Sequence, residues 1–141
     1  MNGVQEWRHG LTADELNSIS EGVIGAAIAV HRELGPGLLE SAYEACLVFE
    51  LMDRGYRVVD QLELPVFYRG QSIGAGFKID LLVNEAVIVE LKAVDRMIPV
   101  YDAQLLTYLK LTQLNLGLLM NFNTVKVIDG VKRIARAFPE P

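Results

Sequence analysis

The chain has 141 residues, of which 51% are hydrophobic and 22% are charged, so it can bury the core of one folded domain without cross-links. Thirteen Lys and Arg against eighteen Asp and Glu give a net charge of −5, which excludes a broad basic coat for nucleic acid but not a local basic patch. One Cys and two His exclude an intramolecular disulfide and argue against a structural zinc site.

The chain shows no sign of a membrane or secretory segment. The longest apolar run, residues 23–30, is far shorter than a membrane span, and the first ten residues lack a signal-peptide pattern. We therefore expect a cytoplasmic protein. No repeat or linker divides the sequence, so we expect a flexible start over residues 1–11 and one domain over residues 12–141.

The first predicted element is a helix over residues 13–34. Thr12 and Glu15 fit the capping-box pattern S/T-x-x-E, and apolar residues recur after them at spacings of three and four. Gly22 and Gly25 weaken a helix, so their presence indicates that a neighbouring element approaches closely there. Gly35-Pro36-Gly37 then ends the helix.

A second helix and three strands follow. The apolar stripe of residues 39–54 predicts the helix, which ends at Gly55. Alternating residues predict a strand over 56–68, where Pro65 indicates an edge position or a bulge. Two further strands are expected over 73–83 and 86–93, with Asn84-Glu85 as the turn between them.

The last third of the chain begins with a helix over residues 99–112, with Pro99 in its first turn. A short, fully apolar strand over 116–122 comes next. We expect a final hairpin of strands 125–128 and 134–138 around Asp129-Gly130. The order α-α-β-β-β-α-β with a short β tail predicts an α+β fold in which helices flank a sheet.

Three ionisable residues occur on the second and third predicted strands. In a hairpin centred on Glu85, facing residue numbers sum to about 170, which places Asp80 opposite Glu90 or its neighbour. Lys92 lies two residues after Glu90 and shares its face. Charges on apolar strands are costly unless compensated, and a divalent cation is a natural counter-charge for two carboxylates.

The same spacing also fits a plainer interpretation. Glu90 and Lys92 could form a surface ion pair on a solvent-facing side of the sheet. The Val87-Ile88-Val89 run just before Glu90 favours a central strand buried on both faces instead.

Two pairs of residues on predicted helices are further candidates. Gln104 and Tyr108 are four residues apart and share a helix face, as a half-buried helix flank would also explain. Glu40 stands in the first turn of the second helix, where an acid favours the helix dipole, and Tyr43 lies one turn later. Taken alone, each pair has an ordinary structural explanation.

The stretch of residues 37–43, Gly-Leu-Leu-Glu-Ser-Ala-Tyr, matches the signature of the GxxExxY proteins, which are similar to the PD-(D/E)XK nuclease superfamily. The resemblance covers about residues 14–138. It implies a restriction-endonuclease-like core, α-β-β-β-α-β, which agrees with the predicted order from residue 39 onward. In this chain that core would carry an extra N-terminal helix and a short C-terminal β hairpin.

The superfamily motif corresponds in this chain to Asp80 followed by Glu90-x-Lys92. Gln104 and Tyr108 match the Q-x-x-x-Y motif of the RecB-like branch. The resemblance implies a metal-dependent nuclease in which Lys92 orients the attacking water and stabilises charge on the phosphorus. Gln104 would position Lys92 or the metal-bound waters, and Tyr108 would contact a phosphate or stack on a base.

The resemblance also implies a metal site. Asp80 and Glu90, with the carbonyl of Leu91, would bind one or two Mg²⁺ or Mn²⁺ ions, and Glu40 would join them through water. The expected activity is hydrolysis of phosphodiester bonds in DNA or RNA.

The negative net charge keeps a second class of function open, because phosphate contacts supply most non-specific affinity for nucleic acid. The chain could be a non-catalytic accessory protein that binds nucleic acid or protein on a nuclease-like fold. It could also be a homodimer, since residues 114–120 are more apolar than a small domain needs. A local patch for phosphate would comprise Lys126, Lys132, Arg133 and Arg136, extended by Arg69, Lys78 and Arg96.

Overall fold

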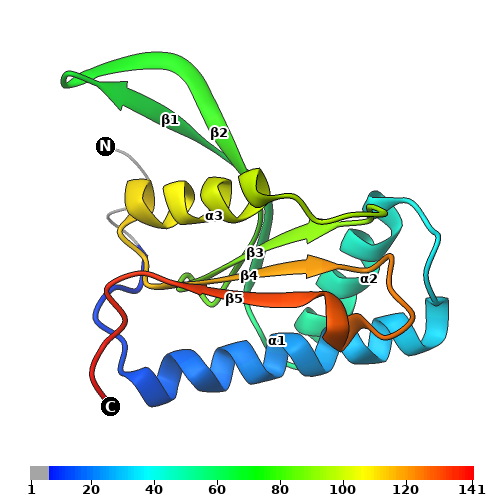
Figure 1. The fold of residues 1–141 in the computed structure, drawn as a ribbon. Coiled ribbons are helices and arrows are strands. Elements are labelled where there is room, and N and C mark those ends of the chain that lie inside the picture. Colours follow the sequence, from blue (N-terminus) through cyan, green and yellow to red (C-terminus); the bar gives the residue numbers. More distant parts are fainter. Residues whose placement is uncertain (1–6) are drawn as a thin grey trace.

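A computed structural model describes residues 7–141 as a mixed five-stranded sheet with helices on both faces (Figure 1). The strands lie in the order β1-β2-β3-β4-β5, and only β3 and β4 run parallel. The elements are α1 Ala13–Leu34, α2 Glu40–Asp53, β1 Val58–Tyr68, β2 Gln71–Val83, β3 Val87–Lys92, α3 Pro99–Thr112, β4 Leu116–Asn121, the 3₁₀ helix η2 Val127–Gly130 and β5 Val131–Ala135.

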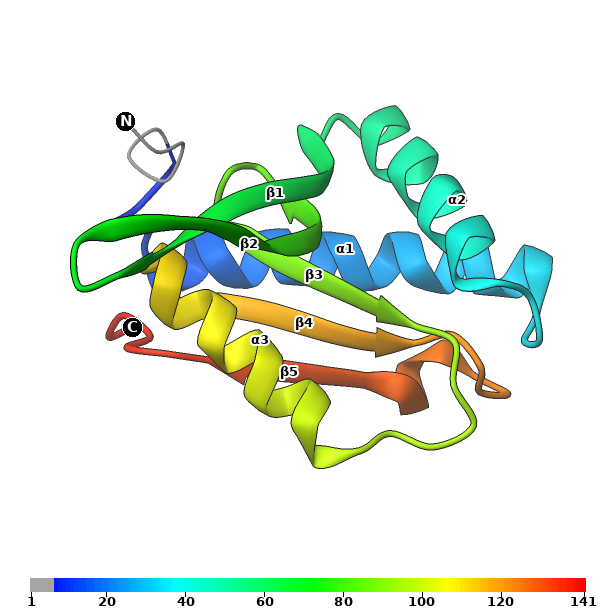
Figure 2. The same ribbon diagram turned by 90° about the horizontal axis from the view of Figure 1, so that it is seen from above.

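Two apolar cores lie on opposite faces of this sheet. The larger joins α1 and α2 to one face, and the smaller joins α3 to the other, as the two ribbon views show (Figures 1 and 2). Along β3, Val87, Val89 and Leu91 belong to the larger core and Ile88 to the smaller one. The prediction of a central strand buried on both faces is therefore confirmed.

The predicted N-terminal helix matches α1 residue for residue. Thr12 Oγ1 accepts a hydrogen bond from the Glu15 amide at 3.1 Å, and the Thr12 amide donates to Glu15 Oε1 at 3.0 Å, which completes the capping box. A Cβ atom on Gly22 would lie 1.7 Å from the hydroxyl oxygen of Tyr56. The predicted close approach is thus confirmed at Gly22.

The hairpin between β2 and β3 also follows the prediction. Asn84 and Glu85 both have positive φ, 50° and 59°, as a two-residue turn between twisted strands requires. Leu81 pairs with Val89, so facing numbers sum to 170. On the other side of β2, the register with β1 shifts between Pro65 and Phe67, which confirms the expected bulge.

The predicted C-terminal hairpin around Asp129-Gly130 is wrong. Residues 127–130 form η2, and β5 pairs antiparallel with β4, from Leu116 opposite Ala135 to Met120 opposite Val131. A Cβ atom on Gly130 would lie 2.3 Å from the carbonyl oxygen of Asn121, so the chain folds back tightly against the end of β4. Strand β5 thus pairs with the open edge of β4, and the residues of β5 do not by themselves indicate this partner.

The structure also bears on two further expectations, the flexible start of the chain and the dimer surface over residues 114–120. Residues 1–6 of the predicted flexible start lie outside the described residues, whereas Trp7 packs against the smaller core and the Arg8 amide donates to the Glu85 carbonyl at 2.9 Å. The apolar side chains of residues 114–120 are buried inside the protein, which removes the basis on which they suggested a dimer surface. Within residues 7–141, no helix combines the length and apolar character needed to cross a membrane.

Candidate functional site

Asp80 on β2 and Glu90 on β3 face each other across the antiparallel pair, as the predicted register requires. The Asp80 amide donates to Glu90 Oε1 at 3.3 Å, and the Leu91 amide donates to Asp80 Oδ2 at 2.9 Å. Each carboxyl group is therefore held by a backbone amide of the neighbouring strand. Both lie on the face of the sheet that α3 covers.

Glu90 lies in an unusual environment for a carboxyl group, because only 5% of its surface is exposed. Burial raises the pKa of Glu90 to about 9, and the side chain of Asp80 acts in the same direction through a hydrogen bond and through its charge, whereas the hydrogen bond from the Asp80 backbone amide acts against the shift. Lys92 partly opposes this shift. Near neutral pH, Glu90 therefore holds a proton when no cation is present to neutralise the pair.

Lys92 follows Glu90 on the same face of β3 and extends toward α3. Its Nζ atom lies 4.3 Å from the centre of the Tyr101 ring. Among residues 7–141, no carboxylate oxygen lies within 4.0 Å of this ammonium. The charge of Lys92 is thus held by an aromatic face and is not neutralised by an ion pair.

Tyr101 was not predicted as a site residue. The signal available in the sequence is its position three residues before Gln104 and seven before Tyr108, on the same side of the helix. In the structure, the side chain against Lys92 is Tyr101, whereas Gln104 is exposed. Within the described part of the chain, Gln104 forms no side-chain hydrogen bond.

Tyr108 lies closer to the acidic pair. Its ring packs against Phe77 with ring centres 5.1 Å apart. Burial raises the pKa of the Tyr108 phenol, and the charges of Glu90 and Asp80 add to the shift. Tyr108 is therefore a protonated donor next to the two carboxyl groups.

Two glutamates approach Asp80 from α2. Partial desolvation raises the pKa of Glu40, the charge of Asp80 adds to the effect, and Lys92 opposes it. Glu44, one turn later, was not predicted. Desolvation raises its pKa as well, with Asp80 adding to the shift, although a 2.6 Å hydrogen bond from Gln61 Nε2 counteracts it. The missed signal is the four-residue spacing from Glu40.

The loop before α2 fixes the place of Glu40. The fully buried Tyr43 donates from its hydroxyl to the Gly35 carbonyl at 2.5 Å and accepts a hydrogen bond from the Leu38 amide at 3.1 Å. Its ring stacks on Phe122 with centres 4.7 Å apart. The Gly-x-x-Glu-x-x-Tyr spacing thus has a physical reason, because the tyrosine clamps the loop that presents the glutamate.

Whether these residues fit a metal ion depends on how many protein ligands it needs. Among residues 7–141, no three acidic, histidine or cysteine side chains are close enough together to enclose an ion. Mg²⁺ is commonly held by one or two carboxylates and keeps several waters. The adjacent carboxyl groups of Asp80 and Glu90, costly to ionise together without a cation, fit that mode of binding.

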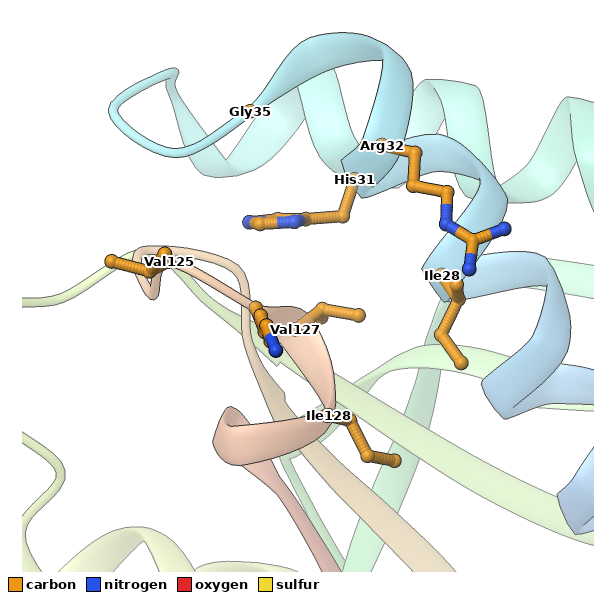
Figure 3. Close-up of a pocket in the computed structure, with 8 residues that line it drawn as sticks. Ile28, His31, Arg32, Gly35, Val125, Val127 and Ile128 are labelled. Carbon is orange, nitrogen blue, oxygen red and sulfur yellow. The ribbon is translucent and has the colours of Figure 1, made fainter.

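The predicted phosphate patch is partly occupied by internal contacts. Lys132 forms an ion pair with Asp102, and Arg133 donates to Asn17 Oδ1 at 2.7 Å. A pocket of about 530 Å³ lies apart from the acidic pair, between α1 and the segment before η2 (Figure 3). His31 lines this pocket and donates from Nε2 to the Phe122 carbonyl at 3.1 Å. None of the predicted catalytic or metal-binding residues lines it.

Comparison with known proteins identifies the family. The family model described as the PD-(D/E)XK nuclease superfamily matches residues 17–134. This match and the observed order of helices and strands confirm the predicted restriction-endonuclease-like fold. No curated protein and no solved structure matches the chain.

Proposed function

The chain belongs to the PD-(D/E)XK nuclease superfamily, and we propose that it hydrolyses phosphodiester bonds of DNA or RNA with Mg²⁺ or Mn²⁺. The observation that carries this proposal is the pairing of the buried Glu90 with the half-buried Asp80, with the Lys92 ammonium, which has no ion-pair partner within residues 7–141, on the same face of β3. We further infer from residues 37–43 that the chain is a GxxExxY protein.

In the proposed site, Asp80 and Glu90 hold one or two metal ions, assisted by the carbonyl of Leu91 and, through water, by Glu40. A bound divalent cation lowers the pKa of a metal-bound water and neutralises charge on the phosphate. Glu44 is placed to add negative charge beside Glu40. Its contact with Gln61 holds it at the edge of the site.

The remaining groups act on the substrate. The Lys92 ammonium orients the attacking water and stabilises the negative charge that develops on the phosphate oxygens. Tyr108 donates a hydrogen bond to a phosphate or stacks on a base. Gln104 contacts the substrate or the metal-bound waters in this scheme, and its exposure on α3 supports that role.

Tyr101 is a positioning residue in this scheme, because it contacts Lys92 and not the reacting atoms. Tyr101→Leu is expected to lower kcat about tenfold, since a cation–π contact holds the ammonium in place with about 1 kcal/mol or more. KM and Mn²⁺ affinity should change little. Steady-state kinetics and a Mn²⁺ titration measure these quantities.

Tyr101→Phe is the matched control, because it keeps the ring and removes only the hydroxyl. It should retain nearly full kcat. Equal losses in both variants would mean that the hydroxyl, and not the ring face, matters. A loss of Mn²⁺ affinity in the Leu variant would point to a general collapse of the site.

A non-catalytic accessory protein is the second candidate. The net charge of −5 and the internal contacts of Lys132 and Arg133 favour it, since they leave few cations free for phosphates. A cleavage assay on labelled single- and double-stranded DNA and RNA separates the two functions. Cutting should require Mg²⁺ or Mn²⁺, stop with EDTA and be absent in Glu90→Ala.

Each result of that assay has a defined meaning. Metal-dependent cutting that the Glu90 variant lacks establishes the nuclease and identifies its substrate. Mn²⁺ binding without cutting of any nucleic acid points to a missing partner or a smaller phosphate ester. If the protein neither cuts nucleic acid nor binds Mn²⁺, the accessory function is favoured, because an accessory protein has no need of a metal.

A further inference from the structure

The hairpin of β1 and β2 extends well beyond the rest of the sheet. Strand β3 pairs with β2 only over residues 81–83, so residues 71–80 of β2 have β1 as their neighbour on one side alone. We call residues 64–77 the arm. Both ribbon views show the arm projecting past α3, away from the body of the protein (Figures 1 and 2).

The arm exposes two aromatic rings and an isoleucine beside the polar residues of its tip, and it carries a single charge, which is positive. Phe67, Tyr68 and Ile73 are 51%, 62% and 54% exposed. The guanidinium carbon of Arg69 lies 5.5 Å from the centre of the Tyr68 ring. Arg69 is the only charged residue of the arm, in a chain whose net charge is −5. The arm therefore has no carboxylate that would repel a nucleic acid, and its exposed rings are available to stack on bases.

The base of the arm leads directly into the proposed catalytic site. Phe77 packs against Tyr108, and Asp80 follows three residues later on β2. From Gln71 at the tip to Asp80, nine residues of strand cover at most about 30 Å at 3.3 Å per residue, since Gly74 departs from the extended conformation with a φ of 83°. A stacked nucleic-acid strand covers this distance in about nine steps of 3.4 Å.

We infer that the arm binds unpaired bases of the substrate strand, up to about nine nucleotides from the phosphate that is cut. This inference rests on the proposed function for the identity of the strand. Exposed rings at the tip stack on bases that are not already paired, whereas the bases of a duplex are covered by their neighbours. Arg69 adds a contact to the backbone or to a base face.

The test measures binding with cleavage disabled. Glu90→Gln serves as the background, and fluorescence anisotropy follows labelled single strands of about 24 and about 6 nucleotides in Mg²⁺. In this background, Phe67→Ala/Tyr68→Ala/Arg69→Ala is expected to raise the Kd for the long strand about 25-fold or more, because each of the two lost stacks weakens binding about fivefold or more. The Kd for the short strand should not change, because it cannot reach from the site to the tip.

Phe49→Ala on α2 is the matched control, since Phe49 is a ring outside the arm that is even more exposed, at 72%. It should leave both dissociation constants unchanged. The inference is overturned if the triple variant binds the long strand normally, if it weakens both strands equally, or if the protein prefers duplex of the same length. It is also overturned if the triple variant changes only the oligomeric state in sedimentation, which would assign the arm to a second copy of the chain.

The proposed function can fail separately. Arm-dependent binding by a protein that never cuts would leave the inference standing and remove the catalytic proposal. If the protein cuts long strands and the arm variant binds and cuts them equally well, the catalytic proposal stands and the inference about the arm is removed. No affinity for any strand, in any of these proteins, would remove both.

Discussion

Lys92→Met is expected to lower the cleavage rate about a thousandfold, since stabilisation of charge in a transition state by one group is worth about 4 kcal/mol. The structure indicates that this substitution removes the charge and leaves the fold unchanged. Methionine keeps the apolar stem that packs between β3 and Tyr101 and removes only the ammonium. Because no carboxylate pairs with that ammonium in the described part of the chain, its loss leaves no buried charge behind. Folding and Mn²⁺ affinity should therefore be retained, as thermal unfolding and a Mn²⁺ titration can verify.

Lys110→Met is the matched control for this experiment. Lys110 is exposed on α3, and its substitution removes the same charge from the chain without touching the site. The cleavage rate of this variant should equal that of the unmodified protein. Near-normal cleavage by Lys92→Met would show that another group orients the water, and the proposed mechanism would be abandoned.

In the absence of divalent cations, the protein is expected to lose stability as the pH rises from 5 to 9. In the unfolded chain Glu90 ionises near pH 4.3, whereas in the folded protein its pKa is about 9. Between these values the folded state binds a proton that the unfolded state has released. One such proton lowers the free energy of unfolding by up to about 1.4 kcal/mol for each pH unit.

Glu90→Gln isolates this contribution. Glutamine has nearly the same shape and cannot ionise, so the variant should show a flatter pH dependence and exceed the unmodified protein in stability at pH 8. Glu40 and Glu44 also have raised pKa values, but they are present in both proteins and affect both curves. Urea unfolding in EDTA at each pH measures the difference.

Adding Mg²⁺ at pH 8 extends the same experiment. The ion should stabilise the unmodified protein, because it displaces the proton of Glu90 and binds only the folded site. It should have little effect on Glu90→Gln. Parallel pH curves for the two proteins would mean that the pKa of Glu90 is the same in the folded and unfolded states.

The sequence predicted those parts of the fold that depend on short-range signals. The capping box at Thr12 and Glu15 marked the start of α1, and Pro99 in the first turn marked the start of α3. The turn at Asn84-Glu85 fixed the register of β2 and β3. Because facing residue numbers in a hairpin have a constant sum, the sequence alone placed Asp80 opposite Glu90 or its neighbour.

Contacts between elements that are distant in the sequence could not be predicted from it. Tyr101 meets Lys92 only because α3 crosses the sheet at a particular angle, which no spacing within the helix specifies. Glu44 lies near Asp80 because α2 packs against the same end of the sheet. The pairing of β5 with β4 likewise depends on which sheet edge is open, and not on the residues of β5 alone.

The most direct test of metal-dependent hydrolysis measures Mn²⁺ binding and nucleic-acid cleavage on the same samples of three proteins. The unmodified protein should bind Mn²⁺ and cut. Lys92→Met should bind Mn²⁺ and fail to cut, and Glu90→Gln should do neither well. Cleavage that persists in EDTA, or cutting by Glu90→Gln at the rate of the unmodified protein, would contradict metal-dependent hydrolysis at Asp80, Glu90 and Lys92.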